Sequence, residues 1–258
     1  MTTSTEQEVT AIPRIEHDEA MQIAAVENRR FGEQLRSLGP DDWTRPTDCP
    51  LWDVRAMAAH VVGSAAGQAS VREFIRQART GRPVTAEIGG KYWWDGMNEI
   101  QVRERAGTTT DDLIAEWDAT WPRAVHARAK LPGLIAGLPL IKFPAPVGRQ
   151  RVSYLFDVGL TRDVWMHRID LAHATGIPLD VDAAHDGRII ADIVAEWAGY
   201  HGEAFTVHLT GPAGGTYMQG SGMQGTGTET HTLDAIEFSR ILAERVDGDG
   251  VLRHKLPL

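Results

Sequence analysis

The chain has 258 residues, of which 42% are hydrophobic, and carries a formal net charge of -9. This length is enough for one large domain or two modest ones with their own cores. Basic residues form no long run, which excludes an electrostatic nucleic-acid footprint, and no apolar run reaches the roughly 18 to 20 residues of a membrane span. The N-terminus lacks a basic region followed by an apolar core, so we expect a cytoplasmic protein without nucleic-acid or membrane partners.

The single cysteine, Cys49, excludes an internal disulfide and any multi-cysteine metal cluster. Histidines and carboxylates must therefore supply any metal ligands. Cys49 stands in an Asp-Cys-Pro context that suits the entrance to a helix, and a lone cysteine is more often structural than nucleophilic. We therefore assign it no catalytic role.

The first half of the chain is mainly helical in pattern. Residues 1–13 are polar and end in Ile-Pro, which predicts a disordered leader. Helical spacing predicts a helix over 15–38 and a second one that begins near Leu51, with Asp53 in its first turn. The stretch 67–93 is interrupted by glycines and a proline and is predicted as the tail of a helix followed by a surface excursion.

Three more segments complete this half. Helices are predicted over 93–105 and 111–130, the second opened by Thr109 and Asp112. The proline- and glycine-rich stretch 132–152 is predicted as an irregular connection to a long helix over 153–175. Amphipathic helices joined by short and medium loops favour an antiparallel bundle.

Beyond Gly176 the pattern changes. A helix is predicted over 183–200, and FTVHLTG, GTYMQG and TETHTL are typical of short strands before a last helix over 235–245 that begins after Asp234. The segment GSGMQG, 220–225, matches GxGxxG but opens no helix, so we interpret it as a hairpin turn. The predicted domains are therefore a leader (1–13), a helical bundle (14–177) and an α+β domain (178–258).

Asp163 and His167 lie one helical turn apart in TRDVWMHRIDLAHATG, so both side chains can contact one object. They share a helix sector with the apolar side chains of Phe156, Leu160, Leu171 and Ala174. A carboxylate in such a sector loses hydration worth several kcal/mol unless it is paired, hydrogen-bonded or bound to a metal. A simple intrahelical Asp–His pair is the alternative to a metal site.

His60 lies on a helix surface of small residues, where another helix can approach closely. A hydrogen-bonded core histidine would explain it. Two histidines and a carboxylate from two facing helices would instead leave a divalent metal with open positions, as in catalytic Zn(II) or Fe(II) sites. Asp170, about 20 degrees from Asp163 on the helical wheel, could orient a ligand or contact a cationic substrate, and a structural salt bridge is equally compatible.

Two stretches carry a family resemblance. RPTDCPLWDVRAMAAHVVG, 45–63, and TRDVWMHRIDLAHATG resemble the two metal-binding helices of the mycothiol-dependent maleylpyruvate isomerase family, a branch of the DinB-like bundles. The closing LDAIEFSRILAER resembles the family's C-terminal domain, so the likeness extends from about Ile15 onward. It implies a mainly α fold, a DinB-like antiparallel four-helix bundle followed by a smaller α+β domain.

The resemblance also implies a set of site residues. It assigns the metal to His60, Asp163 and His167, and it makes Arg245 the candidate for the arginine that the family's tail contributes to substrate binding. The family pattern has Glu where this chain has Asp163, and its closing motif has Gly-Arg where this chain has Glu244 and Arg245.

The resemblance implies a metal-dependent enzyme, with Zn(II) as the expected metal, that uses mycothiol as a thiol cosubstrate. Binding to a divalent metal deprotonates a thiol of pKa about 8.5, which supplies a thiolate to attack an electrophilic small molecule. Both an isomerase and a thiol S-transferase fit this chemistry. A metal-dependent hydrolase without thiol, or a noncatalytic protein that binds a metal or small ligand, are the alternatives.

Overall fold

The computed structural model describes residues 6–220 and 229–258, which form two compact units. Unit 1 contains the described residues up to Glu16 together with Gly137–Arg162 and Asp180–Leu258. Unit 2 contains His17–Ala136 and Asp163–Leu179. The predicted division at residue 177 places 137–162 in the bundle, whereas in the structure this segment belongs to the same compact unit as the C-terminal residues.

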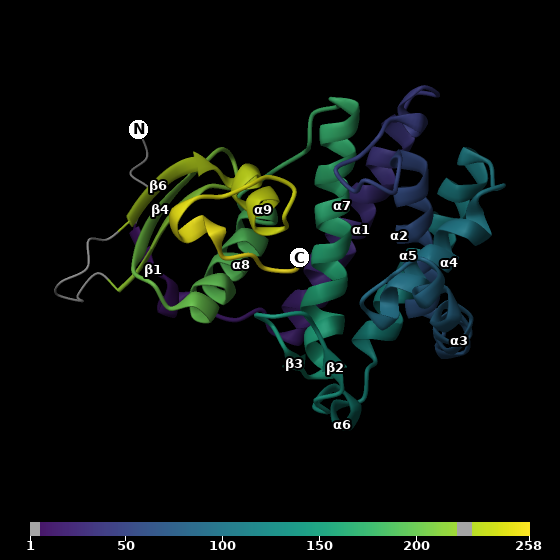
Figure 1. Ribbon diagram of the computed structural model, residues 1–258, viewed down its shortest axis with the longest axis horizontal. Coiled ribbons are helices and arrows are strands. Elements are labelled where there is room, and N and C mark those ends of the chain that lie inside the picture. The colour runs from purple at the N-terminus through teal and green to yellow at the C-terminus, as the bar shows by residue number, and fades with distance from the viewer. Residues whose placement is uncertain (1–5, 221–228) are drawn as a thin grey trace. The chain divides into compact units, whose positions relative to one another are not determined.

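Four helices share the core of unit 2. They are α1 (His17–Ser37), α2 (Val54–Ala69), α5 (Thr110–Ala129) and α7 (Leu160–Thr175, in unit 2 from Asp163), and their labels can be followed in Figure 1. Phe31, Met57, Trp117 and Leu171, one from each helix, belong to a single buried cluster. Burial of such side chains, at roughly 25 cal/mol per Å² of apolar surface, is the main stabilising contribution to this bundle. The predicted mainly α, four-helix-bundle fold is confirmed.

Two further helices of unit 2, α3 (Val71–Glu87) and α4 (Trp93–Arg105), pack on each other and on α2. The predicted surface excursion over 67–93 is therefore wrong for most of its length. Gly81 permits a close approach, because a Cβ atom there would lie 2.6 Å from the backbone nitrogen of Met97 in α4. Pro83 lies inside α3. The glycine serves helix–helix packing here and does not interrupt the helix.

Side-chain caps fix where these helices begin. Asp53 accepts a hydrogen bond from the backbone N–H of Ala56, and Thr109 accepts one from Asp112. Such caps contribute roughly 1 kcal/mol each by satisfying N–H groups that have no partner within the helix. The sequence predicted both positions as helix starts. The short helix α6 (Gly133–Ala136) and a 3-10 turn (Asp42–Thr44) complete the regular structure described in unit 2.

Unit 1 contains a four-stranded sheet in the order β1-β5-β4-β6. Its strands are β1 (Glu6–Glu8), β4 (Phe205–Thr210), β5 (Gly215–Gln219) and β6 (Glu229–Asp234). β4 pairs antiparallel with β5 and parallel with β6. The helices α8 (Asp186–His201) and α9 (Ala235–Leu242) contact each other and the sheet (Figure 1). Alternate residues of β4 are buried, which is the period of a strand with one covered face.

The segments that precede α7 are more regular than expected. The irregular connection contains a short antiparallel pair, β2 (Ile141–Lys142) and β3 (Arg149–Gln150). The long predicted helix over 153–175 begins as a π-helical segment, Tyr154–Gly159, before α7. Other short 3-10 turns are Val9–Ala11 and Gly250–Arg253.

The leader expected to be disordered is ordered from Glu6 onward. β1 pairs parallel with β5, and Val9 and Ile12 are buried. Residues 1–5 lie outside the described chain, as does GSGMQG beyond Gly220, so its interpretation as a hairpin turn stays a prediction. Among the described residues, no helix combines the length and apolar character needed to cross a membrane.

Candidate metal centre

His60 of α2 meets Asp163 and His167 of α7 inside unit 2. His60 Nε2 lies 3.6 Å from Asp163 Oδ2, and His167 Nε2 lies 3.5 Å from Asp163 Oδ1. These separations are longer than good hydrogen bonds. They are close to the roughly 3.3 Å between two ligands that each lie 2.0–2.1 Å from a tetrahedral zinc ion. The donor atoms of all three residues lie within 4.8 Å of one another, so the cluster has the dimensions of a metal site.

The surroundings of His60 favour a ligand at its Nε2 atom. The residue is 3% exposed, and its Nε2 has no hydrogen-bond partner among the residues that the structure describes. Its other ring nitrogen, Nδ1, lies 2.8 Å from Gln101 Oε1. The indole of Trp52 stacks on the imidazole with ring centroids 4.8 Å apart. Since a buried nitrogen without a partner costs about 1–3 kcal/mol, coordination to a metal would compensate for it.

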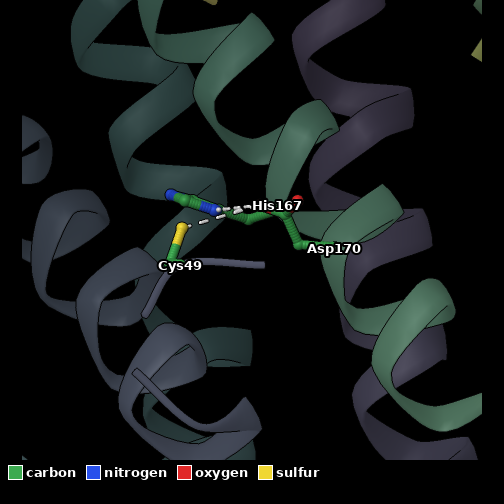
Figure 2. Close-up of side chains that lie close together, drawn as sticks. All are labelled: Cys49, His167 and Asp170. Atoms are coloured by element: carbon green, nitrogen blue, oxygen red, sulfur yellow. Dashed lines mark hydrogen bonds and ion pairs between the residues drawn. The ribbon is translucent and has the colours of Figure 1, made fainter. Parts of the chain in front are cut away.

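His167 is held from its other side by Asp170. Its Nδ1 lies 3.1 Å from Asp170 Oδ2, and Figure 2 shows this pair with the thiol of Cys49, whose Sγ is 4.0 Å from the same carboxylate oxygen. Asp170 has no exposed surface. The geometry therefore favours a role in orienting the imidazole of His167, as carboxylates do for metal-bound histidines, over the alternative of a contact with a cationic substrate.

The charges of the cluster are coupled. Burial raises the pKa of Asp163, but the adjacent imidazole groups of His167 and His60 outweigh burial and hold that pKa below its usual range. Burial lowers the pKa of His167, yet Asp163 and Asp170 outweigh this effect and raise the pKa to about 9. At neutral pH, His167 is thus protonated beside an ionised Asp163. Binding of a metal at Nε2 would have to displace that proton.

The structure brings together four of the five predicted site residues: His60, Asp163, His167 and Asp170. Arg245 belongs to unit 1, where it follows α9 and its Nη1 donates a hydrogen bond to the backbone oxygen of Ala243, 3.0 Å away. Its role in substrate binding stays a prediction.

Two neighbours of His60 were not identified from the sequence. They are Trp52, which stacks on the imidazole, and Gln101, which bonds Nδ1. No local pattern in the sequence identifies Gln101, because its partner His60 lies 41 residues away and its burial depends on packing against other helices.

Comparison with known proteins gives a consistent result. Residues 24–172 match the model of the family described as mycothiol maleylpyruvate isomerase N-terminal domain. A crystal structure of the mycothiol-dependent maleylpyruvate isomerase is similar, with 16% identity, a TM-score of 0.55 and 94% of each chain covered. That of a histidine-to-alanine mutant gives 15% identity and a TM-score of 0.55, covering 93% of this chain and 92% of the other. At these identities the two structures establish the fold.

No curated protein matches the sequence. The family match, however, spans more than half of the chain and includes all three residues of the candidate metal centre. The chain belongs to the mycothiol maleylpyruvate isomerase N-terminal domain family, a family of enzymes.

Proposed function

We propose that this chain is a metal- and mycothiol-dependent enzyme that isomerises, or transfers a thiol to, an electrophilic small molecule. His60, Asp163 and His167 would hold a divalent metal, and their donor set suits Zn(II). The observation that carries the proposal is the buried His60 Nε2, which faces a carboxylate and a second imidazole but has no hydrogen-bond partner among the described residues. Two imidazoles and one carboxylate match catalytic zinc sites, which keep a fourth position open.

Each residue of the centre has a distinct part. His60 and His167 present Nε2, and Asp163 supplies a negative charge that partly neutralises a divalent cation. Asp170 fixes the ring of His167 through Nδ1. When bound, the metal lowers the pKa of a coordinating thiol from about 8.5, so that a thiolate forms at neutral pH.

The thiolate chemistry needs no oxidant or reductant. In an isomerase, a carbon–sulfur bond forms at one carbon of an activated double bond, and the electron pair moves to the activating carbonyl of the substrate. After rotation about the resulting single bond, the carbon–sulfur bond breaks and the thiol is released unchanged. In an S-transferase, the carbon–sulfur bond is kept, and the product takes up a proton.

The test combines metal analysis with a thiol assay on the full chain. Metal content is measured for the wild type, His60→Ala and His167→Ala, with His126→Ala as a matched control that removes a histidine of α5 outside the described clusters. We expect about one metal per chain in the wild type and the control, and a substoichiometric content in the two ligand variants. Full occupancy in both ligand variants would contradict the site assignment.

Turnover is then followed with mycothiol and maleylpyruvate, the substrate that the family's name supplies. An isomerase forms product without net loss of thiol, whereas an S-transferase consumes one thiol per product. Cleavage of the substrate by water without any need for thiol would identify a hydrolase instead. Full metal occupancy with tight ligand retention and no turnover would identify a binding protein.

A further inference from the structure

A chain of amide groups from three helices of unit 2 ends on His60. Gln77 Nε2 of α3 donates to the backbone oxygen of Gly63 in α2, at 2.9 Å. Gln101 Nε2 of α4 donates to Gln77 Oε1, also at 2.9 Å, and Gln101 Oε1 lies 2.8 Å from His60 Nδ1. All three residues are buried: Gln77 is 0%, Gln101 2% and His60 3% exposed. Water therefore does not compete for these hydrogen bonds.

In this series of hydrogen bonds, the contacts of Gln77, at the end away from His60, determine which group donates and which accepts in each bond. A backbone carbonyl only accepts, and Gln77 Nε2 has a second acceptor in the carboxylate of Glu73, 3.0 Å away. Glu73 is ionised, because a hydrogen bond from Arg76 outweighs burial and lowers its pKa. The nitrogen of the Gln77 amide must therefore face Gly63 and Glu73, which leaves its oxygen to accept from Gln101.

The same reasoning carries one step further. Gln101 uses its nitrogen on Gln77, so it presents its oxygen to His60. An oxygen acceptor requires a proton on His60 Nδ1. In a neutral imidazole with its proton on Nδ1, the lone pair lies on Nε2, the atom that faces Asp163 and His167.

We propose that Gln101 and Gln77 are positioning residues: they hold His60 in the tautomer that exposes the Nε2 lone pair to the metal centre. The positioning role deepens the proposed function and rests on it only for the claim that His60 Nε2 binds a metal. Neither glutamine touches the candidate metal ligands other than through His60 Nδ1 in the bonds described.

Two glycines of α2 allow α3 and α4 to pack closely where they carry the two glutamines. A Cβ atom at Gly63 would lie 2.5 Å from Gln101 Cβ, and one at Gly67 would lie 2.9 Å from Gln77 Oε1. Two glycines one turn apart on α2 therefore make room for the two glutamines.

The test reads the tautomer directly in the metal-free chain. With ¹⁵N-labelled histidine, NMR distinguishes protonated from unprotonated ring nitrogens, and a His60→Ala sample assigns the signals. At about pH 8, where an ordinary imidazole is neutral, we expect His60 to carry its proton on Nδ1 in the wild type. In Gln101→Met, which keeps the length but removes the acceptor, we expect a mixture of both tautomers.

Metal affinity supplies the second readout. Gln101→Met is expected to bind Zn(II) about 10–100-fold more weakly, the usual cost of losing a partner that orients a metal-bound histidine. Gln101→Glu keeps an oxygen acceptor at Nδ1 and should preserve the Nδ1-protonated tautomer, although a carboxylate cannot donate to Gln77 Oε1. Gln77→Met frees the Gln101 amide to rotate and should give an intermediate loss.

Gln68→Met is the matched control, because Gln68 lies on α2 but bonds Ser64 and takes no part in the chain of amides. Nε2 protonation of wild-type His60, an unchanged tautomer in Gln101→Met, or an equal loss of affinity in Gln68→Met would overturn the proposal. If wild type binds no metal yet His60 shows the expected tautomer and the expected response to Gln101→Met, the proposed function fails and the positioning role stands.

Discussion

Asp163 and Asp170 occupy the same helix, seven residues apart, but have different surroundings. The side chain of Asp163 is 33% exposed and lies between two imidazoles, whereas that of Asp170 is fully buried and bonds His167 from the opposite side of the ring. A partly exposed carboxylate can become a ligand of a metal ion. A closed one can only orient a neighbour, so the two residues should respond differently to substitution.

Asp170→Asn tests the orienting role. Asp170 is one of two carboxylates that overcome the effect of burial and raise the pKa of His167 to about 9. Removal of its charge should therefore lower the pKa of His167 in the metal-free chain, as measured by NMR titration. Glu33→Gln, at an exposed ion pair with Arg29, should leave that pKa unchanged. A His167 pKa that does not fall in Asp170→Asn would contradict the role assigned to Asp170.

At the scale of elements, α1 and α7 are joined by a buried ion pair. Arg168 Nε donates to Glu27 Oε1 at 2.7 Å, and both side chains are at most 2% exposed. Next to it, Gln34 of α1 donates to the backbone oxygen of Arg168. α7 carries two of the candidate ligands, so its position against α1 matters for the geometry of the centre.

Glu27→Gln should destabilise unit 2 strongly. It replaces the buried carboxylate that accepts from Arg168 Nε with a neutral amide, and loss of one partner of a buried ion pair costs on the order of 3–5 kcal/mol. The exposed pair between Arg29 and Glu33 in α1 provides the comparison, and Glu33→Gln should cost under about 1 kcal/mol. Urea unfolding followed by circular dichroism measures both, and equal costs would show that the buried pair contributes no more than a surface one.

The pairing of α3 with α4 leads to another prediction. A Cβ at Gly96 of α4 would overlap the backbone oxygen of Gly81 and the side chain of Thr85 in α3. Gly96→Ala should therefore force the two helices apart at a cost of about 1–3 kcal/mol. Because α3 and α4 carry Gln77 and Gln101, metal affinity should fall as well.

Gly107→Ala is the control for this substitution, since a Cβ at Gly107 meets no atom within 4 Å. Thermal unfolding and metal titration of the two variants check the prediction. A Gly96→Ala protein with wild-type stability would show that α3 and α4 can separate freely.

The sequence predicted helices well where the signals were local. The caps at Asp53 and Thr109 and the apolar spacing of α1, α2 and α5 need only a window of a few residues. α3 was missed because Gly81 and Pro83 are read locally as helix breakers, while the contact that uses Gly81 comes from α4. The Asp163–His167 pair was visible as an i, i+4 spacing, but the bonding of Gln101 to His60 spans 41 residues and leaves no such spacing.

At the scale of the whole chain, the two units are interleaved in sequence. Unit 1 takes three separate segments, and the first contributes β1 through pairing with β5, more than 200 residues later. A polar terminal strand of three residues carries no local signal that distinguishes it from a disordered leader, because its partner determines its structure. This is the physical reason why the segment predicted as a disordered leader belongs in part to the sheet of unit 1.

Unit 1 also contains a histidine whose protonation makes the free energy of unfolding depend on pH. In unit 1, His201 Nδ1 accepts a hydrogen bond from the backbone N–H of Glu203, and the ring stacks on His254. Burial, with contributions from His254 and Arg253 against an opposing one from Glu203, lowers the pKa of His201 to about 4. The unfolded chain, with a histidine pKa of about 6.5, therefore binds the proton first on acidification.

The stability that His201 contributes is thus fully present above about pH 6.5 and is lost as the pH falls from there toward about 4. In His201→Gln, the dependence of the unfolding midpoint on pH between these values should be shallower than in wild type. His126→Gln, in α5 of the other unit, is the control. An unchanged slope in His201→Gln would show that His201 is not the group responsible.

The candidate ligands come from α2 and α7, with about a hundred residues of chain between His60 and Asp163. A metal held there acts as a reversible cross-link, since only the folded chain presents the three donors together. By mass action, free metal at 100 times its dissociation constant would add about 2.7 kcal/mol to the free energy of unfolding. A chelator would accordingly weaken the helical unit as well as remove the reactive ion, so the resistance of the fold to heat would report the supply of metal.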